Sequence, residues 1–430
     1  MLFNSTLFLV FLAVVVYVYY LLTPQYRRWF LLLASYCFYW VWSVPYSLLM
    51  VLYTLLAYIT ARIIDSSNKK RERTTALISF VVVVISTLCL FKYANFFSAS
   101  AYSLLGFHPW PQLNLLLPLG ISFYTFQTIG YIVDVYKGVT PAQKSFLDLA
   151  LYVIFFPNLV AGPIVRAKVL MPQLTCESPV DWVGIRSGIA QIIWGMLKKV
   201  YIADPMASIT SEAFSAPQSV SGLGLLLATF AFAVQVYCDF SGYSDMAIGS
   251  ARLFGIELPK NFDRPYMAYS ITDFWRRWHI SLSNWLRDYL YIPLGGNRQG
   301  QLRTYANLMI TMLLGGLWHG AGWNWVAWGG LQGAMLSMER AFGLSSAPKS
   351  AGVVFQRILT FADGRIPIDY RPLFYLALVL LVQWGDVKQR WMSWAQMHPN
   401  LLKVIVYTIA IALIFTFAGA SSSNFIYFQF

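Results

Sequence analysis

The sequence is short of charged residues. Only 11% of its 430 residues are Asp, Glu, Lys or Arg, and 58% are hydrophobic, whereas a soluble domain has about 25% charged residues. A chain with so few charges cannot cover its own surface in water, so lipid must cover much of it. The composition therefore excludes an ordinary soluble enzyme and predicts a polytopic membrane protein. The aromatic content of 17% agrees, because Trp and Tyr collect at membrane interfaces.

Cysteine and histidine are also scarce, with four residues of each. The cysteines lie far apart and form no CxxC pair. We therefore infer neither a disulfide framework nor a zinc site, and expect no bound metal or cofactor.

The chain has no long basic arm, although its formal net charge is +13. Its basic residues are scattered among apolar segments, which argues against nucleic-acid binding and favours cytoplasmic loops near anionic headgroups. Arg27 and Arg28 follow the first apolar segment, and the basic stretch 65–73 follows the third. The positive-inside rule places both in the cytoplasm and the N-terminus outside it.

Apolar stretches with about the length of a membrane span dominate the chain. They cover residues 3–22, 29–43, 46–64, 75–98, 115–136, 146–165, 182–200, 220–238, 303–322, 323–340, 370–385 and 401–419. They predict an all-α membrane protein with roughly 11–12 transmembrane or re-entrant helices. The first stretch has no basic residues before it and no cleavage site after it, so we expect it to be a retained span.

Proline and glycine interrupt several of these stretches, notably at Gly120 and Pro157. They predict broken or re-entrant helices, which a membrane tolerates only where they are buried in protein or line a cavity. We therefore expect a cavity. No internal repeat or linker divides the chain, so residues 1–430 are expected to form one membrane domain, with 341–372 as a polar surface loop.

The segment FWRRWHISLSNWLRDYLYIPLGGN, residues 274–297, concentrates polar side chains. Helical spacing predicts one amphipathic helix with an aromatic face that includes Trp278. Its other face is predicted to contain Arg276, His279, Ser283 and Arg287. Two interpretations are open: an interfacial helix whose arginines contact lipid phosphates, or a cationic face that opens into the cavity and binds an anionic cofactor.

A further histidine, His319, lies in GGLWHGAGWNW (315–325), directly after the apolar residues 308–314. An ionisable residue at membrane depth usually faces a cavity or a partner, which favours a functional role; the alternative is a neutral imidazole bound to a neighbouring helix. The surrounding glycines are expected to let a substrate approach closely. Histidine suits general-base catalysis on a hydroxyl, because it titrates near physiological pH.

Weaker signals lie near these histidines. Asp239, in YCDFSGYSD, is expected either to line the cavity or to cap a helix end. Asn307 is expected to make a polar contact inside the helix bundle, and Trp318 to line the cavity beside His319.

RRWHISLSNWLRDYLYIPLGGN, followed by LLGGLWHGAGW, resembles the membrane-bound O-acyltransferase family, especially its bacterial branch of membrane subunits for alginate O-acetylation. LPLGISFYTFQTIGYIVDVYKG (117–138) and FFPNLVAGPIVRAKVLMPQL (155–174) match the same branch. The resemblance implies a ring of helices around a tunnel across the bilayer. It also implies that His319 is the family's near-invariant catalytic histidine and His279 its second.

The resemblance further implies a reaction. An acyl group from a cytoplasmic thioester, acetyl-CoA above all, would pass to an acceptor on the outer side of a bacterial inner membrane. A periplasmic partner enzyme would complete its transfer to a polysaccharide such as alginate, and the N-terminus would be periplasmic. The cationic face of residues 276–287 would then lie near the donor's phosphates.

The chain ends in FIYFQF, residues 425–430. This tail is expected to be an aromatic belt at the outer interface, or, by analogy with the D-alanyl transfer system of teichoic acids, a relay in which Tyr427 accepts the acyl group transiently.

Two other functions remain open. One is acyl transfer to lipid or teichoic-acid hydroxyls. The other is proton-coupled transport with His319 as the relay, for which inverted repeats and charges on several core helices would be expected. The sequence shows no repeat, and its polar groups cluster in one region.

Overall fold

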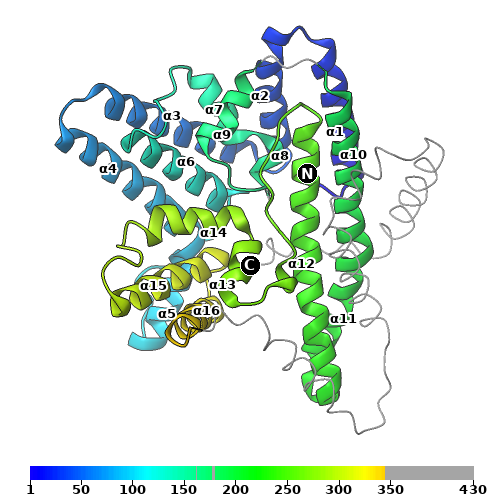
Figure 1. The fold of residues 1–430 in the computed structure, drawn as a ribbon, viewed down its shortest axis with the longest axis vertical. Coiled ribbons are helices and arrows are strands. Elements are labelled where there is room, and N and C mark those ends of the chain that lie inside the picture. Colours follow the sequence, from blue (N-terminus) through cyan, green and yellow to red (C-terminus); the bar gives the residue numbers. More distant parts are fainter. Residues whose placement is uncertain (161, 177–179, 344–430) are drawn as a thin grey trace. The chain divides into compact units, whose positions relative to one another are not determined.

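The computed structural model describes residues 1–160, 162–176 and 180–343, which form helices and no strand (Figure 1). The predicted all-α class is therefore confirmed for this part of the chain. The helices are α1 (Thr6–Leu21), α2 (Pro24–Trp40), α3 (Val44–Ser66), α4 (Lys70–Leu88), α5 (Ala94–Leu105), α6 (Ile121–Tyr136), α7 (Phe146–Ile154), α8 (Phe156–Leu159), α9 (Ala167–Thr175), α10 (Trp182–Met196), α11 (Asp204–Ser215), α12 (Gly222–Arg252), α13 (Ile271–Arg277), α14 (Ile280–Leu286), α15 (Gln301–His319) and α16 (Trp323–Ala341). Three π-helical turns interrupt them: η1 (Cys89–Tyr93), η2 (Leu197–Ala203) and η5 (Arg287–Tyr291).

Three of the described helical segments are long and apolar enough to cross a membrane: α3, Lys70–Leu105 and α12. The second of these joins α4, η1 and α5 without a break. The predicted spans 370–385 and 401–419, most of the loop 341–372 and the tail with Tyr427 lie outside the described residues.

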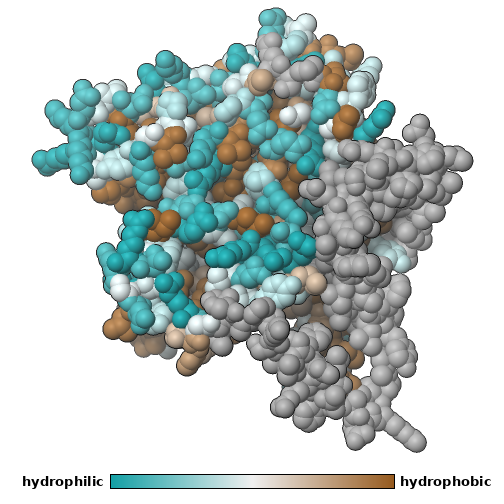
Figure 2. Space-filling view, viewed as in Figure 1, coloured by the Kyte–Doolittle hydropathy of each residue, from teal (hydrophilic) through white to brown (hydrophobic). Residues whose placement is uncertain are grey.

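The surface also carries apolar side chains that water would not favour. On α1, five such side chains at helical spacing are each more than half exposed: Leu7, Val10, Val14, Tyr17 and Leu21. Figure 2 shows hydrophobic residues at the surface and a hydrophilic cluster over the connection between α3 and α4, where the basic stretch 65–73 lies. Exposed apolar helices with polar connections are those of a multi-pass membrane protein.

The chain divides into two compact units. The first contains residues 1–188, 247–260 and 281–334; the second contains 189–246, 261–280 and, among the described residues, 335–343. In the first unit, α3, α4 and α6 pack against one another, and α7 packs against α2, α3 and α9.

The expected helix breaks occur in the first unit. The predicted span 146–165 consists of α7 and α8, which are separated at Phe155. α6 begins only after Gly120, whose φ of 72° is left-handed and whose added Cβ would lie 2.7 Å from the carbonyl oxygen of Leu159. Glycine is needed there because any side chain would collide with the backbone of α8.

α12 extends to Arg252, well beyond the predicted span 220–238. YCDFSGYSD therefore lies inside a helix, so the alternative that Asp239 caps a helix end is wrong. In the second unit, the side chain of Asp239 is 3% exposed and faces Lys199 of η2.

The prediction of a single amphipathic helix within residues 274–297 is also wrong. α13 ends at Arg277 and α14 begins at Ile280, because the intervening His279 adopts a left-handed φ of 42°. The N–H of Ile280 donates to the backbone carbonyl of Asn261 at 2.8 Å. This tertiary hydrogen bond replaces a helical one, so local periodicity does not decide the conformation here.

Candidate active site

His319 is the last residue of α15, and its side chain is buried. Three indoles surround its imidazole: the ring centroids of Trp318, Trp325 and Trp328 lie 5.0, 5.6 and 5.3 Å away. An apolar shell of this kind disfavours a charged imidazolium. The arrangement therefore keeps the imidazole in the neutral form that can accept a proton.

The glycines next to His319 have a different role from the one expected. A Cβ on Gly316 would lie 2.3 Å from the carbonyl oxygen of Trp325, and one on Gly320 would lie 2.2 Å from its indole nitrogen. These glycines let the first turns of α16 pack on the backbone of α15. The prediction that they leave room for a substrate is therefore wrong for Gly316 and Gly320, whose open sides α16 occupies.

The C-terminal end of α15 is held by two side chains of η1. The ammonium of Lys92 donates to the carbonyl oxygens of Trp318 and His319, and the Tyr93 hydroxyl donates to that of Leu317 at 2.7 Å. A cation here satisfies the last carbonyls of the helix and opposes its dipole. Sequence reasoning missed Lys92, although a lone lysine inside the apolar stretch 75–98 is itself a signal of function at membrane depth.

Aromatic rings connect Trp318 to other elements of the first unit. Its indole contacts Phe123 and Phe126 of α6, with ring centroids 5.3 and 5.8 Å apart. Trp285 of α14 stacks on Phe126 at 3.9 Å and 10°, and its indole N–H donates to the carbonyl of Phe126 at 2.9 Å. The rings beside the histidine are thus locked by both stacking and hydrogen bonding.

In the second unit, His279 is fully buried. Its Nδ1 lies 3.1 Å from the side-chain oxygen of Asn261, and the amide of Asn261 donates to Ser244 at 3.2 Å. An amide oxygen only accepts, so Nδ1 of His279 carries the proton and Nε2 is its basic nitrogen. Asn261 was not among the predicted residues, because nothing in its local sequence separates it from an ordinary polar loop residue.

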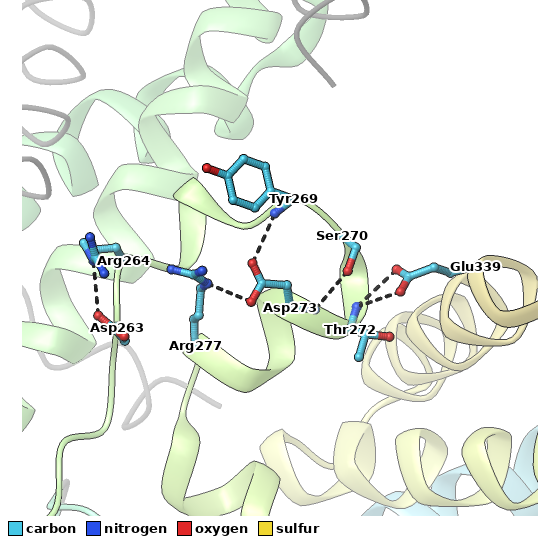
Figure 3. A network of polar contacts seen from close by, with 8 residues as sticks. All are labelled: Asp263, Arg264, Tyr269, Ser270, Thr272, Asp273, Arg277 and Glu339. Carbon is cyan, nitrogen blue, oxygen red and sulfur yellow. Dashed lines mark hydrogen bonds and ion pairs between the residues drawn. The ribbon is translucent and has the colours of Figure 1, made fainter. Parts of the chain in front are cut away.

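Polar contacts hold the start of α13, the helix that leads to His279, and link side chains along it (Figure 3). At its start, the Glu339 carboxylate accepts from the N–H groups of Ile271 and Thr272, at 2.6 and 3.1 Å. Along its length, Asp273 binds Arg277 at 2.9 Å. Burial acts to raise the pKa of Asp273, but its hydrogen bonds outweigh burial and lower the pKa. The carboxylate therefore stays ionised and binds Arg277 one turn further along α13.

The other predicted residues of 276–287 fall into both units. In the second unit, Arg276 is exposed, whereas Trp278 is buried and stacks on Phe274 with ring centroids 5.5 Å apart. In the first unit, Ser283 is half-buried on α14, and Arg287 is exposed. Their roles in donor binding stay predictions.

Two further predicted residues make buried polar contacts. Asn307 donates to the carbonyl of Gly296 at 2.9 Å, which confirms the expected polar contact inside the bundle. In the second unit, the ammonium of Lys199 lies 2.7 Å from Asp239 and 2.8 Å from Asp204. That Asn307 and Asp239 line a tunnel stays a prediction.

Comparison with known proteins gives consistent matches. The sequence model of the membrane-bound O-acyltransferase family matches residues 74–353, which contain both histidines. A protein of Pseudomonas aeruginosa named probable alginate O-acetylase AlgI is 46% identical over 355 residues, which cover 81% of this chain and 68% of that protein. Its namesake from Azotobacter vinelandii is 44% identical over 424 residues, covering 95% and 84%. The peptidoglycan O-acetyltransferase of Helicobacter pylori is 39% identical over 374 residues, covering 80% and 71%.

Proposed function

Because this chain belongs to the membrane-bound O-acyltransferase family, we propose that it passes an acetyl group from a cytoplasmic thioester across the bacterial inner membrane. The acetyl group serves the O-acetylation of an exopolysaccharide, and alginate is the polysaccharide that we propose. The donor in this proposal is acetyl-CoA, and the N-terminus is periplasmic. The observation that carries the proposal is the 44% identity over 95% of the chain to the Azotobacter vinelandii protein named probable alginate O-acetylase.

In the proposed reaction, His319 is the general base. It takes the proton of an acceptor hydroxyl, whose oxygen attacks the thioester carbonyl carbon. The carbon–sulfur bond then breaks, and the proton passes from the imidazolium to the leaving thiolate. The three indoles around His319 suit this step, because they exclude the water that would otherwise hydrolyse the thioester.

His279 is proposed as a second catalytic histidine. Its hydrogen bond to Asn261 leaves Nε2 free of a proton, and so able to accept one from a reacting hydroxyl or thiol. In this scheme Arg276, Ser283 and Arg287 bind the donor, and a periplasmic enzyme completes transfer to the polysaccharide.

Deleting the gene from a strain that secretes an acetylated polysaccharide tests the proposal. We expect the polysaccharide to be secreted in normal amounts with at least about a tenfold loss of ester acetate, because one general base alone contributes about 100-fold or more. Expression of the wild-type chain restores the acetate. An unchanged amount of ester acetate on the polysaccharide of the deletion strain would refute the proposal.

The similarity to a peptidoglycan O-acetyltransferase favours one second acceptor, a cell-wall glycan. The same strains distinguish the two acceptors. If the deletion removes acetate from isolated peptidoglycan and leaves the secreted polysaccharide unchanged, the second acceptor replaces the first.

Tyr427 lies outside the described residues, and we propose that its hydroxyl carries the acetyl group between His319 and the partner enzyme. Tyr427→Phe removes only that hydroxyl, so polysaccharide acetate should fall at least about tenfold, as expected for the loss of a covalent relay. Phe425→Leu in the same tail is the control and should keep acetate near the wild-type level. Full acetylation by Tyr427→Phe would show that no relay through this residue is needed.

A further inference from the structure

Three elements of the first unit meet at a group of cations. Lys137 ends α6, Arg166 precedes α9, and η5 begins with Arg287, Asp288 and Tyr289. These five residues, named here the cationic cluster, come from segments far apart in the sequence. Of the five, only Arg287 was singled out from the sequence.

The cluster is built around the Tyr289 ring and the Asp288 carboxylate. Lys137 Nζ and the Arg166 guanidinium lie 5.8 and 5.3 Å from the centre of the ring. Arg166 also binds Asp288, and Arg287 binds the same carboxylate through two nitrogens, at 2.8 and 3.1 Å. Two guanidiniums on one carboxylate still have donors that point away from it, because each carries five N–H groups.

Positive charge is in excess here. Asp288 compensates one of the three cations, and the buried Asp134 is the other carboxylate close to the Tyr289 ring. Burial acts to raise the pKa of Asp288, but its contacts with Arg287 and Arg166 outweigh burial and lower it, so this carboxylate stays charged. One positive charge remains uncompensated by these two carboxylates, which favours an anionic ligand.

The cluster is accessible and preformed. The side chains of Arg287 and Arg166 are 57% and 31% exposed. The π-helical turn η5 is fixed against α6 at Gly130, where a Cβ would lie 3.3 Å from the indole nitrogen of Trp285 and 3.5 Å from Tyr289. A ligand would therefore meet an arrangement that needs little further ordering.

A row of aromatic rings leads from this cluster to His319 within the first unit. Ring centroids are 5.2 Å apart for Tyr289 and Trp285, and 3.9 Å for Trp285 and Phe126. The row continues with 5.8 Å between Phe126 and Trp318 and 5.0 Å between Trp318 and His319. An apolar wall thus connects the cations with the proposed base.

The cluster also lies on the side where such a donor would be found. Next to Lys137, the carbonyl of Tyr136 accepts from Arg73 at 2.8 Å. Arg73 belongs to the basic stretch 65–73, which the positive-inside rule places in the cytoplasm.

We propose that the cationic cluster binds a phosphate ester, namely the phosphates of a coenzyme A thioester whose pantetheine arm follows the aromatic row to His319. This inference rests on the proposed function and adds Lys137 and Arg166 to the donor site. A phospholipid headgroup carries the same chemical group, so the test must separate these two sources.

The test is calorimetric titration of coenzyme A into the full-length chain in nanodiscs of zwitterionic phosphatidylcholine. Arg166→Gln should weaken binding about 10- to 100-fold, the usual effect of losing a hydrogen bond between charged groups. Lys137→Gln should also weaken binding, and because Lys137 is exposed, its replacement should leave the fold intact. Lys144→Gln, an exposed lysine of the same α6–α7 connection, is the control and should bind like the wild type.

Each possible result of this test bears on either the inference or the proposed function. Equal binding of coenzyme A by wild type, Arg166→Gln and Lys137→Gln would overturn the inference. The inference is also overturned if the wild type binds no coenzyme A but, in nanodiscs that contain anionic phosphatidylglycerol, binds this lipid in a way that Arg166→Gln abolishes. The ligand of the cluster is then a lipid headgroup. If cells acetylate polysaccharide normally but the purified chain binds no coenzyme A, the inference fails and the proposed function stands. Normal binding without any cellular acetylation would reject the function alone.

Discussion

Cells in which His319→Gln replaces the wild-type chain should secrete polysaccharide with ester acetate reduced about 100-fold or more. Glutamine keeps a polar side chain of similar length but cannot accept and release a proton, and general-base catalysis contributes about 10²- to 10⁴-fold. The packing of Trp325 and Trp328 should tolerate it, so the protein should reach the membrane in normal amounts. The measurement is ester acetate per unit of polysaccharide at equal membrane protein.

The other histidines provide the controls. His108→Gln changes an exposed residue and should leave acetate unchanged. His279→Gln should lower acetate by a smaller factor than His319→Gln, because its proposed role is secondary. Normal acetate from His319→Gln at normal protein level would refute the general-base role.

The largest effect on stability is expected at Lys199. Its ammonium is 1% exposed and lies between Asp204 and Asp239, which are themselves 4% and 3% exposed. Lys199→Met fills the same volume but removes the ammonium that lies between the two buried carboxylates. Breaking a buried ion pair in this way costs about 3–5 kcal/mol. We expect little folded protein, measured as the monodisperse peak in fluorescence-detected size-exclusion chromatography.

Removing all three charges separates this explanation from simple damage to packing. Lys199→Met combined with Asp204→Asn and Asp239→Asn removes both carboxylates together with the ammonium, so it should recover much of the lost folded protein. A triple variant as unstable as Lys199→Met would show that the methionine itself disturbs the packing. A stable single variant would show that the ammonium is dispensable.

Features set by composition and long apolar runs could be predicted. The scarcity of charged residues predicted the membrane class. α3 coincides with a predicted span, and α12 contains most of another, because long apolar runs form buried or lipid-facing helices. The same reasoning singled out His319 by its position in an apolar run, and its catalytic role stays a prediction.

Features set by contacts between distant segments could not be predicted. The spacing of residues 274–289 fits one helix, but the backbone of Asn261 holds Ile280 and the helix breaks at His279. Gly316 looks like open space in the sequence and is filled by α16 in the fold. A lysine and its carbonyl partners, such as Lys92 and Trp318, are more than two hundred residues apart.

The close packing of α15 and α16 has a consequence for the biogenesis of the protein. Neither helix is among the described segments apolar enough to cross a membrane alone, yet their backbones meet at Gly316 and Gly329, where a Cβ would lie 2.3 and 2.4 Å from the opposite helix. We expect the two to enter the membrane as a hairpin during translation. Trp325 and Trp328 belong to the second helix, so the nascent chain encloses His319 only after that helix has left the ribosome.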